Sequence, residues 1–357
     1  MKDIIYNLRK FHGKIHEERV NCSCRIKLKE YLKHPSGIKA YILGTPVYSN
    51  IGDSAILLAQ LNFLYNAGWS IERIKEVTFD EYYRYRDIIQ KIIRKNYPIF
   101  GMGGGNMGNQ WQCEEKFRYD VLDDFSNNSI VIFPQTIYFL PNSNEDELKS
   151  VLYYDRREKL TIVAREKKSL SIMKAIYPNT NILYTPDIVL SASMEIFGVK
   201  EQERKDILFC IRNDVEKSVD DDVWTELERI ISDFGKKCKK TDMYSDCPIT
   251  KENRKECVRK KMQEFCQAEL VITDRLHGMI FAAITGTPCI VFSNYNHKVK
   301  GTYEWISYLS YIKYVETIEQ AKKEIPELLT METCKFNNEP LKPYFDKLAK
   351  IVRTSVC

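Results

Sequence analysis

The strongest chemical signal in the sequence is the run TDRLHG at residues 273–278. It lies between the apolar runs Leu270–Thr273 and Met279–Thr285, so we expect it at a turn from a strand into a helix. A guanidinium, an imidazole and a helix N-terminus are all suited to binding a phosphate or a carboxylate. The run therefore predicts an anion site that contains Arg275 and His277.

Two further arginines, Arg165 and Arg212, directly follow the predicted strands Thr161–Ala164 and Ile207–Ile211. The alternative interpretation of both is surface ion pairing, which contributes only about 0–1 kcal/mol each. Ligands of open parallel sheets bind outside the carboxyl ends of the strands. Three arginines at such ends predict recognition of a small, multiply charged anion.

The turn after the predicted strand Lys39–Leu43 contains Asn50, Gly52 and Asp53. Its glycine lets the backbone approach a ligand closely, and the start of the next helix offers unpaired N–H groups to an anion. Asp53 has an alternative role of equal weight, as the N-cap of that helix.

A second glycine-rich turn, GMGGGN at residues 101–106, follows the predicted strand Pro98–Gly101. Its spacing differs from the dinucleotide fingerprint and from the nucleotide P-loop, so neither cofactor is expected. Gly104 and Gly105 permit a flat backbone surface for a sugar or a phosphate, and Asn106 can both donate and accept hydrogen bonds.

The elements that must position these residues alternate between short β-rich runs and longer helical patterns, which is typical of parallel sheets covered by helices. We expect an α/β protein with two Rossmann-like αβα domains that face each other across a cleft. The first domain spans residues 38–195 and the second 207–357, with a polar linker at 196–206 and a basic helical tail at 1–37. The candidate residues should meet at the cleft.

The expected strands lie near 39–43, 77–79, 98–101, 130–133, 161–164 and 181–184, and then near 207–211, 239–243, 270–273 and 289–292. The expected helices begin near Asp53 and lie around 80–96, 144–156, 223–234, 251–267, 279–285, 316–329 and 340–353. The helix from Asp53 is apolar almost all round and should therefore be deeply packed.

The net charge of +5 lies entirely in residues 1–34, which carry nine Lys or Arg and four Asp or Glu. This amphipathic tail could lie on an anionic membrane or on another subunit, and an exposed helix is an equally good interpretation. The rest of the chain has no basic stripe interleaved with aromatics, so no nucleic acid partner is expected. Without a long apolar run or a secretory signal pattern, the protein is expected in the cytoplasm.

The eleven cysteines include no Cys-x-x-Cys pair, and their odd number argues against a disulfide framework. Cys22 and Cys24 could hold a metal together with His12 and His16, but their spacing matches no common structural zinc module. We therefore expect no metal and no cofactor. Cysteines in apolar runs, such as Cys210, are interpreted as small buried hydrophobes of a reducing compartment.

Six short motifs follow one another along the chain: NIGD at 50–53, GGGN at 103–106, PQT at 134–136, Arg165-Glu166, Pro186-Asp187 and RLHG at 275–278. Over roughly residues 38–310 their order resembles the polysaccharide pyruvyl transferase family. The resemblance implies a GT-B-like fold, phosphoenolpyruvate as the donor co-substrate, and transfer of pyruvate to two hydroxyls of a sugar as a cyclic ketal. The turn at Tyr48-Ser49 is less glycine-rich than in many members.

The resemblance also implies roles for single residues. Arg165, Arg275 and His277 match donor-binding positions, to which we add Leu276 and the strand-end Arg212. His277 is expected to act as general acid or as hydrogen-bond donor to the phosphate, and Asp53 or Asp187 to accept the hydroxyl proton. The residues expected on the acceptor side are Asn50, Gly52, Gly104, Gly105, Asn106 and Gln135.

The expected acceptor is a sugar linked to a polyprenyl diphosphate, in a repeat unit of a bacterial capsule or exopolysaccharide. The basic tail would then dock peripherally on the anionic inner face of the cell membrane. Two alternatives stay open: a GT-B glycosyltransferase with a nucleotide-sugar donor, and a non-catalytic carbohydrate-binding relative.

Overall fold

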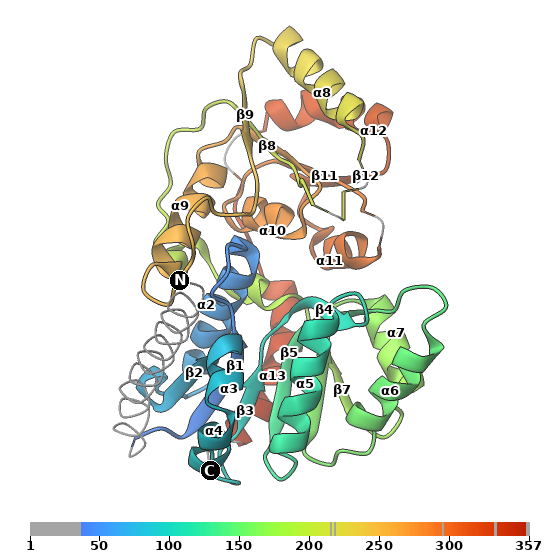
Figure 1. Cartoon of the computed structure of the whole chain (residues 1–357). Coiled ribbons are helices and arrows are strands. Elements are labelled where there is room, and N and C mark those ends of the chain that lie inside the picture. The colour runs from blue at the N-terminus through green and yellow to red at the C-terminus, as the bar shows by residue number, and fades with distance from the viewer. Residues whose placement is uncertain (1–36, 215, 218, 295, 332–333, 355–357) are drawn as a thin grey trace, which may run out of the picture.

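Two parallel β-sheets, each covered by helices, form the protein, as the computed structural model shows (Figure 1). The structure describes residues 37–354 except 215, 218, 295, 332 and 333. The predicted tail, with Cys22 and Cys24, therefore lies outside the described residues apart from Gly37. None of the helices in the described part of the chain is long and apolar enough to span a membrane.

The first sheet has the strand order β2-β1-β3-β5-β6-β7, and β4 pairs with β5 beside this path. All its pairings are parallel. Its strands are β1 (Ala40–Thr45), β2 (Ile74–Thr78), β3 (Ile99–Gly101), β4 (Gly104–Gly108), β5 (Ile130–Tyr138), β6 (Leu160–Ala164) and β7 (Asn181–Tyr184). The accompanying helices are α2 (Ile51–Asn66), α3 (Phe79–Arg84), α4 (Arg86–Ile92), α5 (Gln112–Asp124), α6 (Asn144–Tyr154) and α7 (Lys167–Ile176).

The second sheet has the order β12-β11-β10-β8-β9 and is also parallel throughout. Its strands are β8 (Ile207–Cys210), β9 (Cys238–Thr241), β10 (Leu270–Thr273), β11 (Cys289–Phe292) and β12 (Ile312–Val315). The helices are α8 (Asp221–Asp233), α9 (Arg254–Cys266), α10 (Leu276–Ile284), α11 (Lys298–Ile306), α12 (Ile318–Leu329) and α13 (Lys342–Thr354). The predicted α/β class with two Rossmann-like, GT-B-like domains is confirmed.

In the described part of the chain, one buried apolar cluster spans both domains, and each domain has a further cluster of its own. Helix α2 of the first domain and α10 of the second are buried on nearly all sides, as the absence of a polar face in either sequence requires. Their side chains belong to a single cluster of buried residues that includes Leu57, Leu64, Ile280 and Phe281. Because opening the domains would expose this apolar surface to water, the hydrophobic effect holds them together.

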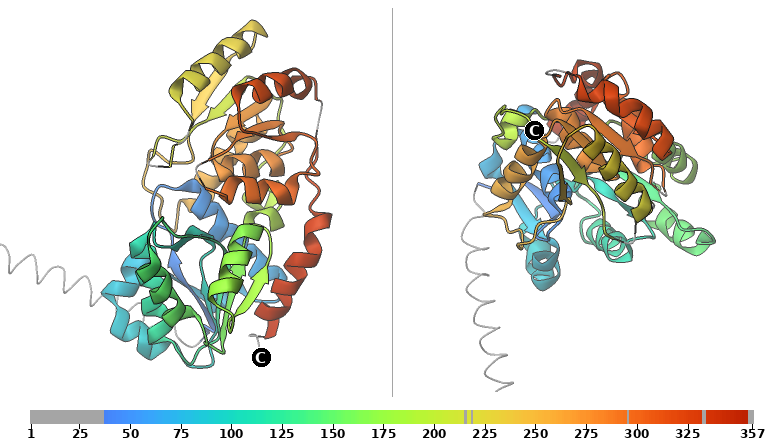
Figure 2. Two further views of the ribbon diagram at one scale, coloured as in Figure 1. Left: turned by 90° about the vertical axis from the view of Figure 1, so that its right-hand side faces the viewer. Right: turned by 90° about the horizontal axis from the view of Figure 1, so that it is seen from above.

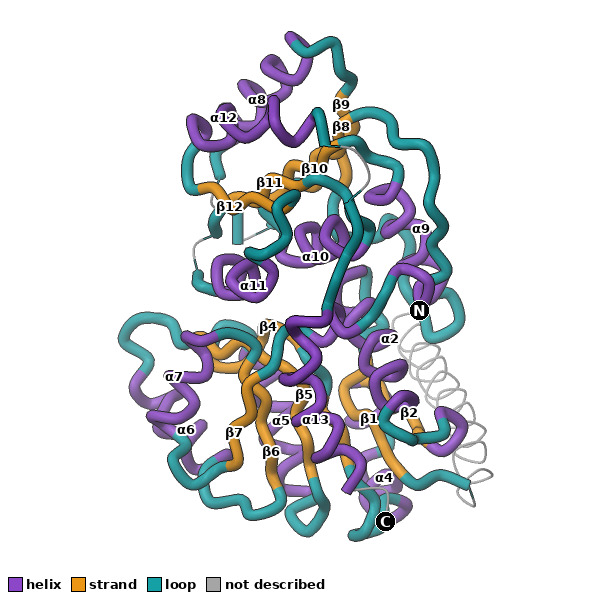
Figure 3. Tube along the Cα trace, turned by 180° about the vertical axis from the view of Figure 1, so that it is seen from behind, coloured by secondary structure: helices purple, strands orange, loops and turns teal. Residues whose placement is uncertain are grey.

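Helix α13 runs back from the second domain along the first, as Figures 2 and 3 show. The indole N–H of Trp69, just after α2, donates to the carbonyl of Val352 at 3.1 Å, and the rings of Phe63 and Phe345 lie 6.1 Å apart. The second domain predicted from the sequence, 207–357, includes this helix. In the structure its apolar face packs against α2 and β7 of the first domain. The apolar face of a helix does not by itself specify which sheet it will cover.

Several elements differ from those expected. The predicted helix at 80–96 is two helices, α3 and α4, separated at Tyr85. The strands β4 and β12 and the helices α5, α7 and α11 were not predicted. Strand β5 continues to Tyr138 through Pro134, which is tolerated because the pairing with β6 is irregular between Ile132 and Gln135.

The substitution Leu348→Ala tests whether α13 belongs to the shared core. Leu348 is fully buried, so its truncation should lower the free energy of unfolding by about 2–5 kcal/mol. Urea unfolding followed by tryptophan fluorescence and by circular dichroism measures this loss. In the matched control, Leu152→Ala on α6, the leucine is 80% exposed, so the change should stay within about 0.5 kcal/mol. Equal losses in both variants would contradict the packing of α13.

Candidate active site between the domains

The carboxyl ends of the two sheets border a single cavity of about 310 Å³ between the domains. This volume lies in the range of small-molecule sites. The predicted site residues that line it are Asn50, Asp53, Gly105, Asn106, Arg165, Arg212, Arg275, Leu276 and His277. The three arginines that follow strands and the histidine therefore line one cavity, as the sequence predicted. Gly52, Gly104, Gln135 and Asp187 do not line this cavity.

Arg165, immediately after β6, is almost completely buried and forms an ion pair with Asp187, which follows β7. Its Nη1 donates to Oδ2 of Asp187 at 2.7 Å, and its Nε donates to the hydroxyl of Thr136 at 3.0 Å. A side chain at Gly105 would lie only 2.8 Å from Nη2 of Arg165. The absence of a side chain at Gly105 therefore leaves room for the guanidinium at the wall of the cavity.

His277 is the second residue of α10, and it enters the cavity from the second domain. Its Nε2 lies 3.6 Å from Oδ2 of Asp187 and forms no hydrogen bond with any described residue. A Cβ at Gly52, in the first turn of α2, would lie 2.5 Å from Nδ1 of His277. Gly52 is thus needed because the N-terminal ends of α2 and α10 approach each other at this point.

Asp187 stays ionised beside Arg165 and His277. Burial by itself raises the pKa of its carboxyl, but His277 and Arg165, together with the backbone N–H of Val189, hold the pKa well below its ordinary value. The carboxylate therefore fixes Arg165 by an ion pair and lies close to the ring of His277. An ionised group with so low a pKa is a poor acceptor for a hydroxyl proton.

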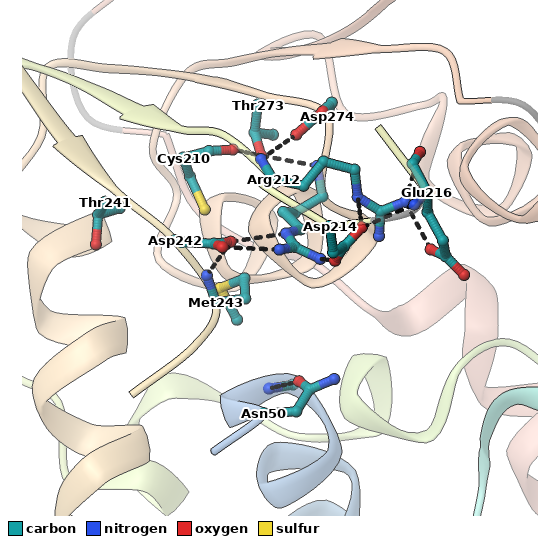
Figure 4. A network of polar contacts seen from close by, with 12 residues as sticks. Asn50, Cys210, Arg212, Asp214, Glu216, Thr241, Asp242, Met243, Thr273 and Asp274 are labelled. Carbon is teal, nitrogen blue, oxygen red and sulfur yellow. Dashed lines mark hydrogen bonds and ion pairs between the residues drawn. The ribbon is translucent and has the colours of Figure 1, made fainter. Parts of the chain in front are cut away.

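Arg275 and Arg212 are held by carboxylates, and Figure 4 shows Asp214, Glu216 and Asp242 around Arg212. Both oxygens of Asp242 accept from Arg275, at 2.7 and 2.8 Å, while Asp214 accepts from its Nη1 at 2.5 Å. Arg212 contacts Glu216 through Nη1 at 2.6 Å. The positive charge of each arginine is therefore already matched within the protein, so the cavity is less cationic than three free guanidinium groups would make it.

Asn50, and not Asp53, is the N-cap of α2. Its Oδ1 accepts the backbone N–H groups of Gly52 at 2.9 Å and Asp53 at 3.3 Å. The capping role considered for Asp53 is therefore wrong, and its carboxylate instead accepts from the hydroxyl of Tyr48 at 3.0 Å. Desolvation raises the pKa of Asp53 despite the opposing influence of His277.

Residues 50–297 match the family described as polysaccharide pyruvyl transferase. The chain belongs to this family. General stress protein 30 of Bacillus subtilis is 33% identical over 278 residues, which cover 76% of this chain and 79% of that protein. Pyruvyl transferase 1 of Schizosaccharomyces pombe is 27% identical over 282 residues, covering 74% and 69%.

The fold also has a counterpart among solved structures. The crystal structure of an uncharacterized protein from Klebsiella pneumoniae matches with a TM-score of 0.54, covering 82% of this chain and 98% of that one. At 16% identity this likeness concerns the fold alone.

In this pyruvyl transferase family member, several cavity residues were missed by sequence reasoning. They are Tyr48, Trp111, Glu114, Asp214, Glu216, Met243, Tyr244 and Lys298. Lys298 begins the unpredicted helix α11, and its Nζ contacts Glu216 at 2.5 Å. Burial lowers the pKa of Lys298 to about 8. Asp242, the partner of Arg275, directly follows β9, so the strand-end signal used for the arginines could have found it.

Polar contacts across the boundary fix the cavity walls. The indole N–H of Trp305 on α11 donates to the carbonyl of Arg165 at 2.8 Å. The carboxylate of Glu166 is fully buried, and it lies 3.1 Å from Nε2 of His297 and 3.0 Å from the hydroxyl of Thr136. The motif Arg165-Glu166 therefore places one side chain at the cavity and the other in the contact between the domains.

The substitution Asp187→Asn tests the buried ion pair. It leaves Arg165 buried without a counter-charge, which should cost about 3–5 kcal/mol of unfolding free energy at neutral pH. Because the pKa of Asp187 is lowered on folding, the wild-type contribution is present above about pH 4, the ordinary carboxyl pKa, and is lost as the pH falls below it.

Urea unfolding at several pH values between 7 and 3 measures the difference between the two proteins. The difference should shrink toward pH 3, and the exposed control Asp246→Asn should behave as wild type at every pH. A difference that does not change with pH would show that the charge of Asp187 is not responsible.

Proposed function

We propose that this protein transfers pyruvate from phosphoenolpyruvate to two hydroxyls of a sugar and so forms a cyclic ketal. The observation that carries the proposal is the convergence of Arg165 from the first domain with Arg275 and His277 from the second on one cavity. Membership of the polysaccharide pyruvyl transferase family supports it. The three side chains offer donors of the kind that recognise the carboxylate and phosphate of such a donor.

The reaction balances without a further reactant. A proton adds to the methylene carbon of phosphoenolpyruvate, and the oxygen of one sugar hydroxyl adds to the carbon that bears the phosphate. The bond from that carbon to the phosphate oxygen then breaks, and the oxygen of the second hydroxyl closes the ring. Of the two hydroxyl protons, one compensates for the proton taken up by the methylene carbon and the other leaves with the phosphate.

The surroundings of the two candidate carboxylates separate their roles. His277, which lies beside the ionised Asp187, is the proposed general acid or phosphate hydrogen-bond donor. Asp53 lines the cavity, and because desolvation raises its pKa it is a better acceptor for the hydroxyl proton. We therefore assign Asp187 a positioning role and Asp53 the role of general base.

The proposed acceptor is a sugar in a lipid-linked precursor of a bacterial capsule or exopolysaccharide. The family is named for polysaccharides, and the basic residues of the 1–34 segment would favour an anionic membrane surface where such precursors are assembled. Binding of this segment to such a surface would bring the cavity close to the lipid-linked precursor.

The substitutions His277→Ala and Arg275→Ala test the assignment of the site. Each should reduce turnover by about a hundredfold or more, the usual scale for a general acid or a charge-stabilising donor. Mass spectrometry of a glycan incubated with phosphoenolpyruvate measures the product. Arg229→Ala is a matched control because this α8 side chain is 69% exposed. Near-normal rates in either site variant would show that the site is misplaced.

Thermal stabilisation tests the choice of donor. Because a ligand that binds only the folded state raises the melting temperature, phosphoenolpyruvate at 100 times its dissociation constant should contribute about 2.7 kcal/mol. Differential scanning fluorimetry with phosphoenolpyruvate, uridine diphosphate sugars and inorganic phosphate compares the candidates. Stabilisation by the nucleotide sugars alone would favour the glycosyltransferase alternative instead.

A further inference from the structure

Three large aromatic side chains remain exposed around the cavity. Tyr48 is 45% exposed, Trp111 42% and Tyr244 46%, and all three line the space that contains Arg165 and His277. Leaving large apolar surface in contact with water is unfavourable, and a cluster of such surface at a cavity marks a binding site. We refer to Tyr48, Trp111 and Tyr244 as the aromatic rim.

Two side chains of the aromatic rim, Tyr48 and Tyr244, lie on loops that backbone contacts join across the domain boundary. The loop of Tyr48 precedes α2, and the loop of Tyr244 follows β9 in the other domain. Asn50 and Tyr244 form an isolated antiparallel bridge, and Ser245 N–H donates to the carbonyl of Ser49 at 2.8 Å. The two rings therefore stand on joined loops, which lowers the entropy cost of ordering them around a ligand.

Two carboxylates lie among these rings. Asp53 accepts the hydroxyl of Tyr48 at 3.0 Å, and Glu114, in the first turn of α5, lines the same cavity close to Trp111 in the chain. Burial raises the pKa of both acids, and Asp53 raises the pKa of Glu114 further. The hydroxyl groups of a ligand can donate to both carboxylates.

We propose that the aromatic rim, with Asp53 and Glu114, is a subsite for the pyranose ring of the acceptor sugar. This inference rests on the proposed function and specifies where the acceptor binds in the same site. A sugar ring has an apolar C–H face that packs on an aromatic ring and hydroxyl edges that donate to carboxylates.

The rim and the cations of the cavity meet at Tyr244. The guanidinium of Arg275 lies 5.4 Å from the centre of the Tyr244 ring, and both side chains line the same cavity as Asp53 and Glu114. A sugar stacked on the rim would therefore lie next to the proposed donor-binding residues.

Trp111→Ala and Trp111→Phe provide the test, with Tyr65→Ala as the matched control because Tyr65 on α2 is 62% exposed and does not line the cavity. Kinetics are measured with phosphoenolpyruvate and p-nitrophenyl glycosides of galactose, mannose and N-acetylglucosamine. We expect turnover of at least one of these glycosides. In Trp111→Ala the acceptor KM should rise tenfold or more while the phosphoenolpyruvate KM changes less than twofold, and Trp111→Phe should restore most of the affinity.

The outcomes separate the subsite from the reaction. An acceptor KM in Trp111→Ala within twofold of wild type would overturn the subsite while ketal formation still supported the proposed function. Failure to bind any neutral glycoside in the presence of stabilising phosphoenolpyruvate would overturn it as well. If phosphoenolpyruvate does not bind but Trp111→Ala weakens neutral glycoside binding in a tryptophan fluorescence titration, the subsite stands and the proposed donor is wrong.

Discussion

The buried ion pair between Arg165 and Asp187 is the constraint on which the cavity depends. Both groups lie in the first domain, yet each reaches the second: the carbonyl of Arg165 accepts from Trp305, and the carboxylate of Asp187 lies 3.6 Å from His277. A buried charge is tolerated only when a partner and hydrogen bonds compensate for its desolvation. Within this pair, Asp187 lies between the guanidinium proposed to bind the donor and an imidazole that comes from the other domain.

The packing around this pair favours a preformed site over one assembled by domain closure. The ends of α2 and α10 approach so closely that only a glycine fits at position 52, opposite His277. Behind them the shared core continues through both helices to α13. A hinge motion at this boundary would expose that core to water. We therefore expect ligands to reach the cavity without separation of the domains.

The predicted ends of the strands were the most informative feature of the sequence, because ligands of parallel sheets bind at the carboxyl ends of the strands. Arg165, Arg275 and His277 could be found in this way. Lys298 and Trp111 could not be found, because the sequences of α11 and α5 showed no clear helical pattern. The sequence also could not decide whether Asn50 or Asp53 is the helix cap, because this depends on which side chain accepts the backbone N–H groups of Gly52 and Asp53. The glycine-rich strand β4 was also missed, since its pairing with β5 and not its β propensity defines it.

The carboxylates paired with the arginines have a consequence for binding. Uncompensated guanidinium groups would hold a phosphate product as firmly as the donor, and binding energy spent equally on donor and product does not speed the reaction. Asp214 and Asp242 on Arg275, and Glu216 on Arg212, offset part of that attraction while fixing the planes of the guanidinium groups. In the proposed reaction, recognition of the phosphate would then depend on the orientation of the remaining N–H groups rather than on the excess charge, which would permit the phosphate to leave once the carbon–oxygen bond has broken.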